Sequence, residues 1–590
     1  LDRGQLGDTR IVRFRRAGNQ VLLIQDNTDY QARSDDPLEV KAVTEAFATS
    51  VLASLEIVAE DQGAPVVDLS PLLYSDSHGI AAHLAAIDQG SFSFNKGRSA
   101  VFPEHLLNFP ENSIVQVLLS FNGTKPGDWV RQVTPTPERL SVTYLHQFTD
   151  LPDAGFTPRT FHTRSGYFGA SFRDYAVPLG EDLEIYYLSR HRLQYRDDVP
   201  ADAATSGRAW PVKDPIVYYL DPGTPEPVRS ALLEGASWWA DAFEAAGFAD
   251  AYRVEMLPAD AHPLDIRYNV IQWVHRATRG WSYGGSVRDP RTGEIIKGHV
   301  TLGSLRVRQD MLIAEALTAP FKDGITISEP AKQMALARLR QLAAHEVGHT
   351  LGLAHNFAAS SVGDASVMDY PHPNLYLGDD GRVGIDRAYQ TGVSPWDRWT
   401  IRYGYAQYPA AQEQQALNQL LQEADQQGFL YASDPDARVP GSAYAQAHLW
   451  DNGNDPLQRF DELLAIRAQG LAGFSEQVLP EGRPLFELEQ RLVPVYLLHR
   501  FQVEAVGKQL GGVIFDHRLR GERFDGVTAV PLKRQRAAMQ ALMSALDTEF
   551  LMLPKALLNR IPPPAEGYVR GREYFQHFSA NEFDHLAPAR

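Results

Sequence analysis

The sequence predicts an α+β fold in three parts, and three observations predict it. Runs of β-branched and aromatic residues dominate roughly the first 200 positions, which favours an N-terminal α/β region with antiparallel strand pairing. In the middle of the chain, strand-like runs precede one long helical stretch. From about residue 405 onward the spacing of apolar residues is helical. We therefore divide the chain into residues 1–205, 206–405 and 406–590.

The N-terminal part begins with a predicted hairpin. Residues 10–25 form two β-rich runs around a turn at 17–19. The same enrichment predicts strands over 113–121 and 139–148, whereas the apolar spacing of 38–60 predicts a helix. These elements together favour an α/β region whose strands pair antiparallel.

The central part follows a predicted linker at 197–215, where prolines stand among small residues. We expect strands at 216–220, 265–274 and 295–302, and helices at 226–246 and 329–352. The last strand alternates as if one face were exposed, and it is a candidate for the edge of a sheet.

The C-terminal part is predicted to be mainly helical. The candidate helices are 410–427, 456–471, 485–510 and 533–550. Residues 451–455 have oxygen-bearing side chains around a glycine, a composition that Ca²⁺ favours, but they lack the spacing of a known calcium loop. A polar turn with a helix cap is the favoured interpretation, and Ca²⁺ is the alternative.

The composition excludes several classes of protein. Among 590 residues, 73 acidic and 56 basic side chains give a formal net charge of -17, which argues against a nucleic-acid binder. No run of about 18 apolar residues is present, so we expect no membrane-spanning helix. The chain has no cysteine, which removes disulfides, thiolate zinc ligands and nucleophilic thiols from consideration.

The end of the long central helix carries a metal-binding pattern. His345 and His349 stand one helical turn apart, so both imidazoles can reach one metal ion. Glu346 lies beside that face and can hold a metal-bound water as the general base. Gly352 can adopt a left-handed turn that ends the helix and lets His355 return as the third ligand. Three imidazoles and a water leave the open position that a catalytic zinc ion needs.

A methionine turn follows these ligands at Met368, within Ser366-Val367-Met368-Asp369-Tyr370. Such a turn beneath three histidines marks the same class, although a lone Met368 is more typical of core packing. With both motifs, the sequence resembles the metzincin clan of zinc endopeptidases from residue 216 to about 370. More narrowly, it is similar to a bacterial group of metzincin-like proteases with an N-terminal domain of unknown function. The narrower resemblance is carried by residues 267–273, 289–295, His355-Asn356-Phe357, Ser360-Ser361 and 510–512.

The resemblance implies a metzincin-like catalytic domain, with a mixed twisted sheet and an active-site helix above a cleft and a lower subdomain after Gly352. It implies that Glu346 deprotonates the zinc-bound water and passes the proton to the leaving amine. Tyr370 matches the tyrosine with which astacin-like and serralysin-like members stabilise the oxyanion, and local packing is its alternative role. Asn356 fits a supporting or turn residue better than a ligand.

The resemblance also places the strand before the active-site helix at the sheet edge over the cleft, at residues 297–304. An extended peptide can pair with a free edge there, so the candidate substrate-binding residues are Gly298, His299, Val300, Thr301 and Leu302. An ordinary internal strand is the alternative. Side-chain preference would come from a pocket walled by His349 and the loop 371–377.

We therefore expect a zinc-dependent endopeptidase that holds one catalytic Zn²⁺ and hydrolyses extended polypeptides. Two alternatives remain: a peptidase restricted to short peptides, and a catalytically silent zinc-containing protein that binds peptides. The N-terminal part is interpreted as a prodomain, a substrate-binding platform or a packed structural lobe. The chain begins at Leu1 rather than at a methionine, and we expect export to the periplasm or the medium.

Overall fold

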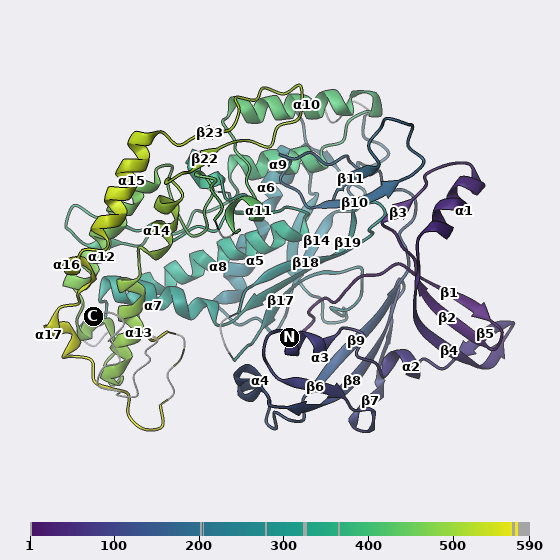
Figure 1. Cartoon of the computed structure of the whole chain (residues 1–590), viewed down its shortest axis with the longest axis horizontal. Coiled ribbons are helices and arrows are strands. Elements are labelled where there is room, and N and C mark those ends of the chain that lie inside the picture. The colour runs from purple at the N-terminus through teal and green to yellow at the C-terminus, as the bar shows by residue number, and fades with distance from the viewer. Residues whose placement is uncertain are drawn as a thin grey trace.

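The computed structural model confirms the α+β class, with strands concentrated in the first half of the chain and helices in the second (Figure 1). It describes residues 3–200, 203, 206–277, 280–322, 327–363, 366–439, 441–568, 571 and 573–575.

The N-terminal part is mostly strands. β1 (Val12–Ala17), β2 (Gln20–Gln25), β4 (Ser50–Asp61) and β5 (Ala64–Val67) form one antiparallel sheet, and β6 (Ser91–Phe94), β8 (Asn112–Thr124), β7 (Ala100–Asn108) and β9 (Ser141–Thr149) form another. A third sheet holds β11 (Glu184–Leu188), β10 (Gly169–Asp174) and β3 (Tyr30–Gln31). Short helices lie at α1 (Pro37–Ala46), α2 (Ser70–Leu73), α3 (Ile80–Ala86) and α4 (Asp128–Val133). The predicted hairpin and the predicted antiparallel pairing are confirmed.

The prediction of a helix over 38–60 is wrong for the second half of this range. Helix α1 ends at Ala46, and the following residues form β4, which pairs antiparallel with β2. Leu55 and Ile57 face the core with exposed fractions of 0% and 9%, whereas Val58 is exposed. The apolar residues of this stretch fit both a helical and a strand period, and pairing with the neighbouring hairpin decides between them.

The central sheet has the order β12-β19-β17-β14-β16, with β18 added to β19. Every pairing in it is parallel except the antiparallel pairing of β18 with β19. The strands are β12 (Arg190–His191), β14 (Ile216–Leu220), β16 (Tyr252–Met256), β17 (Asn269–Val274), β18 (Tyr283–Arg288) and β19 (Glu294–Gly303).

Strand β19 is internal, which corrects the expectation that it forms the sheet edge. Its backbone groups pair with β17 on one side and with β18 on the other. Gly298, His299, Val300, Thr301 and Leu302 are all buried and lie between these two neighbours. A substrate therefore finds no free backbone groups on this strand, and the outer strand at this side of the sheet is β18.

Helices α5 (Val228–Ser237), α6 (Trp239–Ala245) and α8 (Glu329–Thr350) belong to the main hydrophobic core together with the central sheet. Helices α5 and α8 lie side by side (Figure 1). They approach closely because a Cβ at Gly235 would overlap the backbone of Arg340. Helix α8 thus packs against both the sheet and α5.

The C-terminal part is mainly helical, as predicted. Its helices are α9 (Pro395–Tyr405), α10 (Ala410–Gln426), α11 (Asp434–Ala437), α12 (Pro456–Ala472), α13 (Leu488–Tyr496), α14 (Arg500–Gly507), α15 (Leu532–Ser544), α16 (Thr548–Leu551) and α17 (Lys555–Leu558). The predicted helix 485–510 is divided into α13 and α14, and α7 (Arg306–Thr318) was not predicted. Asp455 caps α12 by accepting hydrogen bonds from the backbone amides of Leu457 and Gln458, which confirms the predicted polar turn and helix cap.

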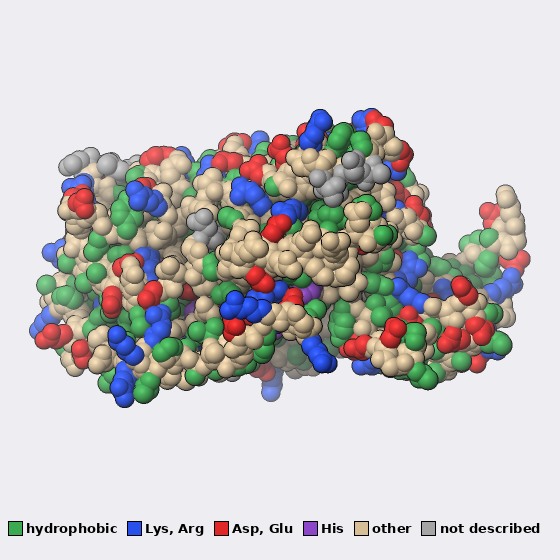
Figure 2. Space-filling view, turned by 90° about the horizontal axis from the view of Figure 1, so that it is seen from above, with side chains coloured by type: hydrophobic (Ala, Val, Ile, Leu, Met, Phe, Trp, Pro, Cys, Tyr) green, Lys and Arg blue, Asp and Glu red, His purple; other side chains and the backbone are tan. Residues whose placement is uncertain are grey.

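Three two-stranded pairs complete the fold: β13 (Trp210–Pro211) with β15 (Phe248–Ala249), β20 (Tyr376–Leu377) with β21 (Val383–Gly384), and β22 (Val513–Ile514) with β23 (Thr528–Ala529). Among the described residues, no helix is both long and apolar enough to cross a bilayer. Figure 2 shows acidic and basic side chains interspersed over one face of the molecule.

Candidate metal centre

Helix α8 places the first two histidines. The Ser328 side chain caps its first turn, and the helix runs without interruption to Thr350. His345 and Glu346 are buried, with exposed fractions of 2% and 4%. The helix therefore presents its ligand-bearing face inside the molecule and not to open solvent.

Gly352 makes the turn that brings the third histidine back. Its φ is 103°, in the region that only glycine adopts readily. A Cβ at this position would also overlap the carbonyl oxygen of Ser189. The sequence-based role of Gly352 as the residue that ends the helix thus has both a conformational and a steric reason.

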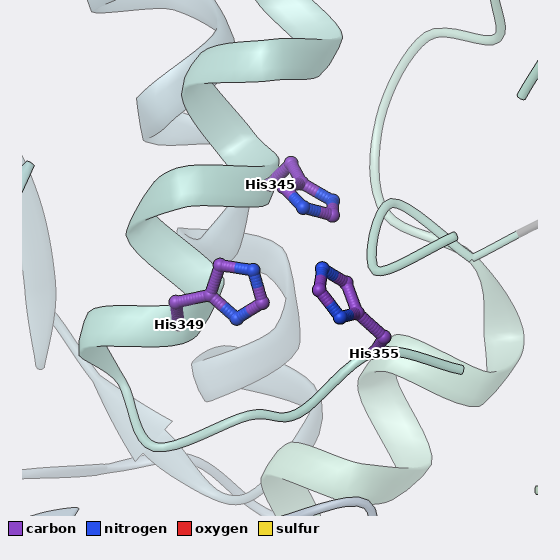
Figure 3. Close-up of side chains that lie close together, drawn as sticks. All are labelled: His345, His349 and His355. Atoms are coloured by element: carbon purple, nitrogen blue, oxygen red, sulfur yellow. The ribbon is translucent and has the colours of Figure 1, made fainter. Parts of the chain in front are cut away.

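The three histidines meet at one point (Figure 3). One ligand atom from each of His345, His349 and His355 lies within 4.8 Å of the other two. Their Nδ1 atoms are engaged outside the triad, at 2.6 Å from the Val367 carbonyl, 2.8 Å from the Leu353 carbonyl and 2.7 Å from the Asp434 carboxylate. An Nδ1–H that donates to these acceptors leaves Nε2 with a free lone pair.

The remaining ring nitrogens fit a metal ion. Nε2 of His345 and Nε2 of His355 are buried and have no hydrogen-bond partner. Burial lowers the pKa of His345 well below its usual range and that of His349 to about 3, and the neighbouring imidazoles add to the effect. Neutral imidazole nitrogens in a set of three are a donor set that suits Zn²⁺.

Met368 lies directly beneath these ligands. It is fully buried, and a Cβ at Gly348 would overlap its sulfur, so the methionine packs against α8 at the residue before His349. The turn is anchored by Asp397, whose carboxylate accepts hydrogen bonds from the Ser366 hydroxyl and the Val367 amide. The carbonyl of Val367 in turn accepts from His345.

Comparison with known families agrees with this geometry. Residues 328–585 match a family model described as Met-zincin. These residues are therefore similar to the Met-zincin family. Residues 4–196 match a model described as Domain of unknown function (DUF5117). A search of curated proteins found no match.

The Met-zincin match begins at Ser328, the cap of helix α8, and contains all three histidines. The family assignment and the histidine triad indicate a zinc metallopeptidase. The strands β14 to β19 of the central sheet lie before the matched residues.

Glu346, which lies within the matched residues, is on α8 against strand β18. Burial raises the pKa of Glu346 to about 8, although the Arg338 guanidinium and a backbone hydrogen bond from Gly284 act in the opposite direction. A Cβ at Gly284 would overlap the carbonyl oxygen of Glu346, so only glycine permits this close approach. The raised pKa makes the ionised carboxylate of Glu346 a stronger base than an exposed carboxylate, which suits a general base.

Strand β18 was not among the strands predicted from the sequence. Its glycines were the available signal, since a glycine inside a strand often marks a close backbone approach. Among the described residues, β18 pairs with no strand except β19. In the part of the chain that the structure describes, β18 is therefore the outer strand on the side of the sheet where Gly284 meets Glu346.

Tyr370 lies beside the triad, as predicted. Its ring centroid is 5.2 Å from that of His345 and 4.7 Å from that of His355. Burial raises the pKa of Tyr370 to about 12, so its hydroxyl keeps its proton. Trp281 and Trp450, which the sequence did not single out, lie against this ring with centroids at 6.3 and 4.9 Å.

A cavity of about 620 Å³ adjoins this aromatic group. Trp281, Trp450 and the loop residues Pro371, His372 and Pro373 line it. His349, expected as a wall of the specificity pocket, does not line this cavity and lies beside Phe168 of the N-terminal part, with ring centroids 5.7 Å apart. The N-terminal part thus contributes an aromatic side chain next to the metal ligands.

Proposed function

We propose that this chain is a zinc-dependent endopeptidase that hydrolyses peptide bonds within extended polypeptides. One observation carries the proposal: three imidazoles converge on one point, the Nε2 atoms of His345 and His355 are buried without a hydrogen-bond partner, and the buried carboxyl group of Glu346 follows His345 on the same helix. Zinc, when bound, supplies Lewis acidity for the scissile carbonyl and for a water molecule.

The residues of the chain have separate roles in this proposal. His345, His349 and His355 hold the ion. Glu346 accepts the proton of the attacking water and delivers it to the leaving amine. The protonated hydroxyl of Tyr370 donates a hydrogen bond to the oxygen on which negative charge develops.

The outer edge of β18, along which no second described strand pairs, supports an endopeptidase over an enzyme limited to short peptides. An extended chain can add to such an edge through backbone hydrogen bonds, with little dependence on its side chains. The strand runs past Glu346, where Gly284 allows the close approach. A polypeptide laid along it is bound on both sides of the bond to be cleaved.

The test compares the zinc-loaded full chain with its Glu346→Gln variant on unfolded casein and on a series of short peptides. We expect the wild-type chain to cleave casein, a chelator to stop the cleavage, and Glu346→Gln to lose about 10³-fold or more in kcat while it still binds zinc. The variant keeps the shape of the side chain and removes only its basicity.

Each alternative has its own result. Cleavage of short peptides without cleavage of casein would favour the restricted peptidase. Stoichiometric zinc without any cleavage by the wild-type chain would favour a silent peptide-binding protein and would overturn the proposal.

A further inference from the structure

The three histidines differ in what holds their Nδ1 atoms. His345 and His349 face backbone carbonyls, those of Val367 and Leu353. Only His355 faces a side chain, the carboxylate of Asp434, at 2.7 Å. A carboxylate is a stronger acceptor than a carbonyl, so it fixes the ring more firmly and makes its other nitrogen more basic.

Asp434 belongs to the C-terminal part of the chain and lies far from His355 in sequence. It is the first residue of the short helix α11. One carboxylate oxygen accepts from His355, and the other lies 3.1 Å from Nε of Arg438. The guanidinium group of Arg438 in turn stands 5.3 Å from the centroid of the Tyr370 ring. The carboxylate is thus held from its second side and is oriented toward the histidine.

Asn356, the residue after the third histidine, docks the segment that carries Asp434. Its side-chain amide donates to the carbonyl of Leu430 at 2.9 Å, and its side-chain oxygen accepts from the amide of Ala432 at 3.2 Å. The amide of Phe357 donates to the Ala432 carbonyl at 2.8 Å. Asn356 is fully buried. Residues 430–432 are thereby aligned beside 356–357, which brings Asp434 opposite His355.

We propose that Asp434 is a positioning residue for the metal site, and that Asn356 acts through it by holding segment 430–432. The third ligand is then completed by the C-terminal part of the chain and not by the helix and turn alone. This inference rests on the proposed zinc site but not on peptidase activity, because it concerns metal binding.

The test measures zinc affinity of the full chain by competition with a chromogenic chelator, for wild type, Asp434→Asn and Asp434→Ala. We expect Asp434→Ala to bind zinc roughly 10–100-fold more weakly. Asp434→Asn keeps an acceptor for Nδ1–H without the charge, so we expect it to recover part of that loss. The visible spectrum of the Co²⁺-loaded chain reports the ligand field of the three histidines. We expect it to change more in Asp434→Ala than in Asp434→Asn, as the zinc affinity does.

Asp436→Asn is the matched control. Asp436 lies in the same short helix, where it accepts from the Ser433 amide and contacts His517, but no hydrogen bond joins it to the triad. We expect its zinc affinity to stay within about twofold of wild type.

Two results would overturn the inference. One is a zinc affinity and Co²⁺ spectrum of Asp434→Ala equal to those of wild type. The other is an equal loss in Asp436→Asn, which would assign the effect to the fold of α11 and not to the carboxylate. If Asp434→Ala does not fold, the zinc affinity and Co²⁺ spectrum of Asp434→Asn are compared with those of wild type, and values equal to wild type would overturn the inference. A chain that binds zinc with this dependence but cleaves nothing would refute the endopeptidase and leave the role of Asp434 intact.

Discussion

At the scale of single residues, the site combines groups that chain neighbours hold in place with groups that come from elsewhere. The helical histidines and Glu346 are neighbours on α8, so their relative placement follows from one helical turn. Tyr370 follows the methionine turn and contacts His345 and His355 through its ring. Its position therefore depends on how that turn packs beneath the helix.

Tyr370→Phe separates the two roles considered for this residue. The phenylalanine keeps the ring contacts with Trp281 and Trp450 and removes only the hydroxyl. If the hydroxyl stabilises the oxyanion, kcat on a peptide substrate should fall about 10²-fold, with KM and zinc affinity unchanged. An unaltered kcat in steady-state measurements would assign Tyr370 to packing alone.

At the scale of elements, the contact between β18 and α8 defines the upper side of the site. Gly284 and Gly285 are adjacent in β18 but point to opposite faces of the sheet. At Gly284 a Cβ would overlap the carbonyl oxygen of Glu346, whereas at Gly285 it would meet only a methyl group of Leu6 at 3.4 Å. The two glycines therefore form a natural pair for mutation.

Gly284→Ala should push β18 away from α8. We expect a loss of about 1–3 kcal/mol in the free energy of unfolding and of about 10²-fold in kcat/KM, since displacement of a positioning strand is costly to catalysis. Gly285→Ala should leave the free energy of unfolding and kcat/KM close to their wild-type values. Urea unfolding and peptide kinetics measure the two quantities. Equal effects of both variants would show that close approach to Glu346 is not what requires Gly284.

At the scale of the whole molecule, distant parts of the chain are fixed around the same centre. Phe168 of the N-terminal part lies beside His349, and β12 pairs with β19 of the central sheet. The side chain of Asn112 joins the N-terminal part to the backbone of Leu264 and Ile266. Such contacts are typical of a lobe that stays packed. Export from the cytoplasm stays a prediction.

Because the site joins these parts, zinc should stabilise the whole fold. Binding to the folded state alone adds about 4 kcal/mol when free zinc is near 1,000 times Kd. We expect a chelator to lower the unfolding temperature by several degrees, and His345→Ala to remove the difference between zinc-loaded and chelated samples. Thermal unfolding followed by calorimetry measures this. A wild-type transition that does not respond to chelation would contradict a structural contribution of the ion.

Much of the metal centre was predictable from the sequence because its ligands are local. His345 and His349 share a helix face, Gly352 permits the turn, and His355 follows directly, so short-range geometry suffices. The helix-bearing C-terminal part was predictable for the same reason, since helical periodicity is a property of consecutive residues.

Tertiary structure decided which strand forms the edge of the central sheet. The outer strand is β18, and β19 is internal. Alternation along a strand reports on the two faces of a sheet, whereas an edge is defined by hydrogen bonds in the sheet plane, and residue order does not record those. The same reason hides Asp434, Phe168, Trp281 and Trp450, which reach the site from separate segments. The sequence by itself determined which residues are the candidate metal ligands and the proposed general base, because they are close neighbours in the chain, and only the packing of distant segments decided what surrounds and orients them.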